Sequence, residues 1–111
     1  MLFCLTGNYT PKSLNAIMDN PAANRVAAAT KLVEAAGGKM ISMYSTVADG
    51  PGVMVIFDVP DPGSAAAISG ITVATGAVQN VQLKRLLSAE EVVSVRTKAA
   101  QLRGAYTPPA G

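Results

Sequence analysis

Histidine is absent from this chain of 111 residues, which also has a single cysteine. The chain therefore lacks the side chain that most often serves as general base and as metal ligand. One cysteine, Cys4, excludes an intrachain disulfide. It lies in an apolar segment and has no histidine to activate it, so we predict a buried, inert thiol. A metal site would need a cluster of carboxylates, and the sequence predicts none.

Charge is also scarce. Charged residues make up 14% of the chain, against about 25% in an average globular domain. The net charge is +2, and the only adjacent basic residues are Lys84 and Arg85, so no nucleic-acid surface is predicted. No apolar run reaches the roughly 18 residues that span a bilayer, and the first residues lack the basic region of a signal peptide. We therefore expect a cytoplasmic protein without membrane contact.

Capping and turn residues divide the chain into strands and helices. Strands are predicted over residues 2–8, 39–47, 53–59 and 77–87, and helices over 10–20, 21–36, 64–74 and 88–103. The pairs Thr10-Pro11, Asn20-Pro21 and Asp61-Pro62 are typical of helix starts. Ser88 and Glu91 have the spacing of a capping box.

This order of elements is that of the ferredoxin-like βαββαβ fold with a C-terminal helix. It predicts an α+β architecture, in which helices cover one face of a four-stranded antiparallel sheet. A single domain is predicted over residues 1–103, followed by an extended tail over 104–111.

The predicted strands are apolar on both faces. In the third strand Val53, Val55 and Phe57 alternate with Met54 and Ile56. The helices are too few to cover both faces of the sheet, and a bare apolar face is rare in monomers. We therefore predict a homodimer, or a higher oligomer, in which two sheets face each other with Met54 and Ile56 in the interface. The alternative is that the C-terminal helix folds over that face.

A polar row of Ser42, Tyr44 and Thr46 alternates along the second strand. We predict that this row lines a cavity between the sheet and the helices. There the Tyr44 hydroxyl, with Asn8 or Thr6 nearby, would orient a small apolar ligand. An edge strand with one wet face is the alternative.

Asp58 interrupts the apolar third strand. It is a candidate general base in a cavity. Alternatively, it lies solvated at the end of the strand, or pairs with Lys84 or Arg85.

Several segments together resemble the GYD-domain family, and they cover nearly the whole chain. They are residues 7–11, 37–39, Tyr44, 53–61, 64–67, 75–78, 86–91 and 106–109. The resemblance implies a ferredoxin-like, dimeric α/β barrel, and it implies no general activity. The chain departs from the family where a Gly-x-Tyr-Asp-like turn is expected before the third strand. That turn reads Asp49-Gly50-Pro51-Gly52 here, without the Tyr-Asp pair.

Two interpretations of function remain. The first is a homo-oligomeric binding or accessory protein that holds a small apolar ligand and has no cofactor. The second is a cofactor-free enzyme of the dimeric α/β-barrel type, similar to an oxygenase or isomerase, that uses Tyr44 with Asp58 or Asn8. The missing histidine and the sparse charges favour the first, because the second rests on fold analogy alone.

Overall fold

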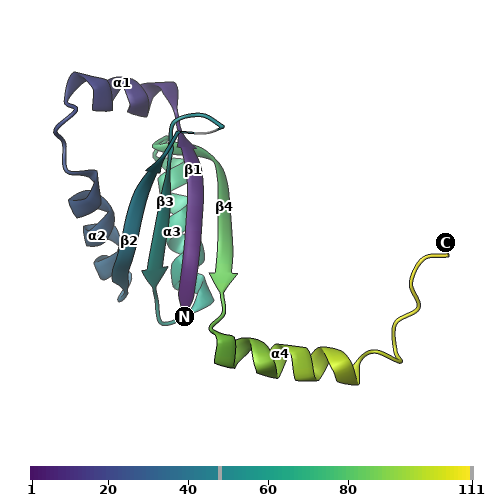
Figure 1. The fold of residues 1–111 in the computed structure, drawn as a ribbon. Coiled ribbons are helices and arrows are strands. Elements are labelled where there is room, and N and C mark those ends of the chain that lie inside the picture. Colours follow the sequence, from purple (N-terminus) through teal and green to yellow (C-terminus); the bar gives the residue numbers. More distant parts are fainter. Residues whose placement is uncertain (48, 111) are drawn as a thin grey trace.

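The computed structural model describes residues 1–47 and 49–110 (Figure 1). Its elements are β1 (Leu2–Tyr9), α1 (Pro11–Asp19), α2 (Arg25–Ala35), β2 (Lys39–Thr46), β3 (Gly52–Asp58), α3 (Pro62–Ala74), β4 (Val78–Leu86) and α4 (Ala89–Gln101). The four strands form one sheet in the order β2-β3-β1-β4, and all neighbouring strands are antiparallel. The predicted α+β, ferredoxin-like order of elements is confirmed.

Side-chain caps start the helices, although one start was predicted at the wrong place. Thr10 accepts a hydrogen bond from the Ser13 N–H at 3.2 Å, and Asp61 accepts one from Ser64 at 2.7 Å, as expected. Asn20 instead ends α1, because its N–H bonds back to carbonyls of that helix. Helix α2 begins four residues later than predicted, where Asn24 accepts from the Ala27 N–H at 2.9 Å.

The core lies between the sheet and helices α2 and α3. Odd-numbered residues of β1 and β3 point toward these helices, as alternation requires, and all of them except the half-buried Tyr9 are buried. Phe57 is fully buried, and its ring stacks on Phe3 with 6.1 Å between ring centroids. Val33 of α2 and Ile68 of α3 complete this core from the helix side.

The opposite face of the sheet, which we call the open face, is apolar at its centre. The strand register places Cys4 between Ile56 and Lys84, and Thr6 beside Met54. Cys4, Met54 and Ile56 are half-buried. The prediction of a buried cysteine is therefore wrong for the single chain, because even-numbered residues of β1 point away from the helices and Cys4 is half-buried. Its inertness stays a prediction.

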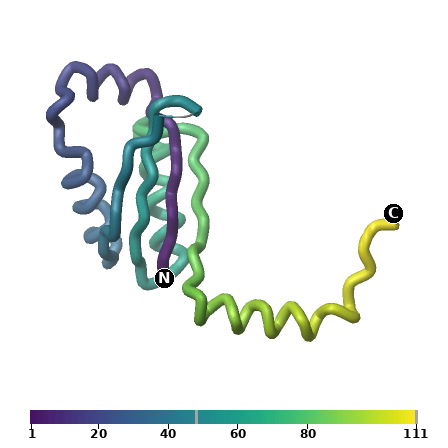
Figure 2. The backbone as a smooth tube through the Cα atoms, in the orientation of Figure 1, coloured from purple at the N-terminus to yellow at the C-terminus, as the bar shows by residue number. Residues whose placement is uncertain are grey.

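Helix α4 does not cover the open face. It leaves the end of β4 and runs away from the sheet (Figures 1 and 2). None of its residues is buried. The alternative prediction, in which the C-terminal helix folds over the second face of its own sheet, is therefore wrong. After this helix, residues 102–105 form turns and residues 106–110 have no regular secondary structure, and Gly111 lies outside the described residues.

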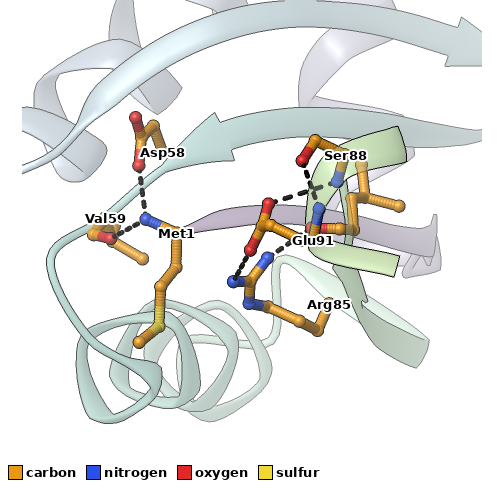
Figure 3. A network of polar contacts seen from close by, with 7 residues as sticks. Met1, Asp58, Val59, Arg85, Ser88 and Glu91 are labelled. Atoms are coloured by element: carbon orange, nitrogen blue, oxygen red, sulfur yellow. Dashed lines mark hydrogen bonds and ion pairs between the residues drawn. The ribbon is translucent and has the colours of Figure 1, made fainter. Parts of the chain in front are cut away.

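The first turn of α4 is held by the predicted capping box (Figure 3). The Ser88 hydroxyl accepts from the Glu91 N–H at 3.1 Å, and the Glu91 carboxylate accepts from the Ser88 N–H at 3.1 Å. Arg85 adds an ion pair to Glu91 at 2.8 Å. The Ser88 N–H and the Arg85 guanidinium lower the pKa of Glu91 below its ordinary value.

We expect this cap to weaken in acid. Because the pKa of Glu91 is lowered in the folded chain, its stabilisation is present at neutral pH and is lost as the pH falls through that lowered value. The helical signal of α4, followed by NMR chemical shifts, should therefore fall in acid, at pH values below the ordinary pKa of a glutamate side chain. Glu91→Gln keeps the capping geometry but loses the charge. Its first turn should therefore show a flatter pH response, and an unchanged response would contradict the assignment.

Candidate functional site

One cleft among the described residues is lined almost entirely by apolar side chains. It opens between α2 and α3 and reaches the face of the sheet that these helices cover. Its floor includes Leu5, Val55 and Phe57, and its walls include Ala29 of α2 and Ile68 of α3. Small alanines on α2 leave room that larger side chains would fill. The cleft has a volume of about 130 Å³. An apolar cavity of about 150 Å³ is known to hold benzene, so this space suits a single ring.

Few polar groups border this cleft. Tyr9 ends β1 on the covered face, and Arg25 is the only charged residue among the described residues that line the cleft. Thr72 also lines it, but its hydroxyl donates to the Ser69 carbonyl within α3 at 2.8 Å. Neither of the two ion pairs among the described residues involves Arg25. Tyr9 and Arg25 are therefore the lining residues whose polar side-chain groups have no partner among the described residues of the cleft wall and are available to a ligand.

The predicted polar row does not border this cleft. Ser42 and Tyr44 pair with Ile56 and Met54, so they lie on the open face, and Tyr44 is 57% exposed. A β-bulge between Met40 and Ser42 shifts the alternation of β2. As a result Met40 and Met43 pack against the core, while the polar residues face outward. The predicted position of the row between sheet and helices is wrong.

The residues of the predicted enzyme centre are not brought together in one chain. Tyr44 pairs with Met54, which is four residues from Asp58 along β3, a distance of about 13 Å. Asn8 lies two strands away from Tyr44, about 10 Å across the sheet. Asp58 is exposed and pairs with the Met1 amino group at 2.7 Å, not with Lys84 or Arg85 (Figure 3).

Thr6 and Asn8 do meet, in a shallow polar hollow at the end of the open face. Thr46, Asn80 and Gln82 also line this hollow. The Asn8 amide donates to the Asp49 carbonyl at 3.1 Å and accepts from the Asn80 amide at 3.4 Å. The first bond ties the β2–β3 turn to β1, and the second joins β1 to β4, so Asn8 has a structural role at this end of the sheet. The ligand-binding role of Thr6, Asn8, Ser42, Tyr44 and Asp58 stays a prediction.

The cleft residues Tyr9 and Arg25 were missed at the level of sequence. Alternation from Phe3 and Leu5 places Tyr9 on the covered face, which is a signal that the sequence does contain. No pattern in the sequence indicates that Arg25 lines the cleft, because its position depends on the residue at which α2 begins.

Metal sites and membrane-spanning helices each have requirements that residues 1–47 and 49–110 do not meet. No three acidic or cysteine side chains gather there in a way that could hold a metal ion. No helix in these ranges has the length and apolar content needed to cross a bilayer.

Comparison with known proteins gives the fold and the family. A solved structure of 5-chloro-2-hydroxyhydroquinone dehydrochlorinase from Burkholderia phenoliruptrix AC1100, in complex with 2,5-dihydroxybenzoquinone, is similar with a TM-score of 0.56 and 19% identity. The similarity covers 81% of this chain and 97% of that one. No curated protein matches this chain in sequence. The sequence profile of the GYD domain matches residues 3–95. The chain belongs to the GYD-domain family.

Proposed function

We propose that this chain is a homo-oligomeric binding protein that holds a small single-ring ligand in the cleft between the sheet and helices α2 and α3. The cleft itself carries the proposal. It combines a volume of about 130 Å³ with nearly uniform apolar walls and two polar side chains, Tyr9 and Arg25. Binding pockets for small molecules have this character, with apolar walls and a few orienting groups.

The polar pair indicates the kind of ring. A hydroxyl and a guanidinium both donate hydrogen bonds, so they favour a ring with oxygen substituents. The similar dehydrochlorinase was solved with 2,5-dihydroxybenzoquinone, which is such a ring. That likeness supports the ligand class, and it assigns no reaction to this chain.

The oligomer in this proposal is a dimer made by two open faces. Met54, Ile56 and Cys4 form a half-buried apolar centre that none of the helices within residues 1–47 and 49–110 covers. A second sheet stacked about 10 Å away would bury this centre completely. Met54 and Ile56 are then interface residues.

We expect Ala29→Phe to abolish ligand binding, because the new ring occupies the cleft. The probe is 2,5-dihydroxybenzoquinone, followed by ¹H–¹⁵N NMR titration and thermal unfolding. At ten times its Kd, a bound probe should raise the Tm of the unmodified chain by about 5 °C. Signals of cleft residues such as Tyr9 and Ile68 should shift.

Ala27→Phe is the matched control. It makes the same change on the same helix, at an exposed alanine that does not line the cleft. It should bind the probe like the unmodified chain, and both variants should unfold cooperatively. The cleft would not be a binding site if the probe still shifted the NMR signals of Ala29→Phe. The same conclusion would follow if the probe shifted no signals in the unmodified chain or in either variant.

A further inference from the structure

Helix α4 is the least explained element of the fold. It contributes no buried residue, and only Val92 is half-buried. The tube in Figure 2 shows it running outward from the foot of β4, with the tail beyond it. The radius of gyration is 17.5 Å, against about 13 Å for a compact chain of this length.

The helix has too little support to stand alone in water. Isolated helices shorter than about 12–15 residues are marginal even in favourable sequences. The capping box and the Arg85–Glu91 ion pair secure only the first turn. The remaining turns need a surface to pack on.

One side of α4 is built for packing. Residues at spacings of three, four and three share a single side of this helix: Val92, Val95, Ala99 and the C-cap residue Leu102. We call this the α4 stripe. Val95 is 51% exposed and Leu102 is 53% exposed in the single chain.

We propose that α4 is an arm whose stripe packs against a second copy of this chain. This inference rests on the dimer proposed above and adds a second contact to it. The arm starts at Ala89, three residues after Leu86, which pairs with Leu2 at the end of the open face. A helix of 13 residues is about 20 Å long, which is long enough to reach a second copy packed against this sheet.

The solvent-accessible area of the single chain indicates that the partner packed on the α4 stripe is a second copy of this chain. The chain exposes 7518 Å², about 1,800 Å² more than a compact monomer of 11.3 kDa. If each of two chains buried that excess, the interface would bury about 3,600 Å² in total. Obligate homodimers bury about 2,000–5,000 Å². The excess is therefore of the size that a permanent dimer needs.

Two matched double variants of the full-length chain test the arm. Val95→Asp with Ala99→Asp places two carboxylates on the stripe. Val93→Asp with Ala100→Asp makes the same changes on the same helix, but away from the stripe. Sedimentation equilibrium should show a dimer Kd raised at least about 30-fold by the stripe variant and about 2-fold or less by its control. Thermal unfolding confirms that both remain folded.

Ile56→Arg separates this inference from the proposed dimer. If the stripe variant dissociates while Ile56→Arg stays dimeric, the arm is confirmed and the open-face interface is wrong. If the stripe variant dimerises like its control, the arm is overturned and the open-face dimer stands. A monomeric unmodified chain at micromolar concentration overturns both.

Hydrogen exchange gives an independent measure of what covers α4. Its amides should exchange slowly above the dimer Kd and quickly below it. Slow exchange at all concentrations would mean that α4 packs on its own chain, and it would overturn the inference.

Discussion

Ile56→Arg is expected to turn the dimer into a folded monomer. Ile56 lies at the centre of the open face, where the register places it between Cys4 and Ser42. In a sheet-to-sheet dimer this position is buried, and a lone guanidinium buried there would cost several kcal/mol. In the monomer the same side chain reaches water, so the fold tolerates it. Sedimentation equilibrium should show the Kd raised by at least about 100-fold.

Ile71→Arg is the matched control for this prediction. Ile71 lies on α3, on the other side of the sheet, and is 47% exposed. The same substitution there should leave the dimer intact.

Cys4 supplies a second measurement, because it lies beside Ile56 on the open face. A thiol reagent should label Cys4 slowly in the unmodified dimer and quickly in Ile56→Arg. Rapid labelling of the unmodified protein, or a dimer that survives Ile56→Arg, would contradict the proposed interface.

Local signals in the sequence were sufficient for the order of the elements. Side chains such as Thr10, Asp61 and Ser88 accept hydrogen bonds from N–H groups only three residues away, so the residues themselves mark the helix starts. Alternation likewise placed Val55 and Ile56 on opposite faces. These interactions involve neighbours in the chain, and no knowledge of the tertiary fold is needed to infer them.

The candidate site could not be predicted in the same way, because it depends on long-range packing. A polar row such as Ser42 and Tyr44 shows which residues share a face, but not which face the helices cover. The answer depends on the bulge at Ile41. Because of this extra residue, Met40 and Met43 both point toward the helices, and Ser42 and Tyr44 point to the open face. The cleft depends on the spacing between α2 and α3, which no run of adjacent residues encodes. For the same reason Arg25 could not be recognised before the start of α2 was known.

Gly52→Ala is expected to destabilise the fold strongly, at the start of β3 directly after the turn from β2. Gly52 is buried and pairs with Asn8 on one side and Thr46 on the other. A Cβ atom there would overlap the Gly7 carbonyl oxygen, which is backbone and cannot rotate away. Strands β1 and β3 would have to separate locally. We expect a loss of about 2–3 kcal/mol in the free energy of unfolding, and a fall in Tm of about 10 °C.

Gly70→Ala makes the same chemical change with the opposite expected sign. Gly70 lies inside α3, and a Cβ atom there would meet nothing within 4 Å. Alanine stabilises a helix interior by about 0.5–1 kcal/mol relative to glycine. Chemical denaturation of the two variants, measured side by side, should therefore bracket the unmodified chain. If Gly52→Ala unfolded at the same denaturant concentration as the unmodified chain, the close approach of β3 to Gly7 would not be a feature of the folded protein. The tight turn would then not depend on glycine at this position.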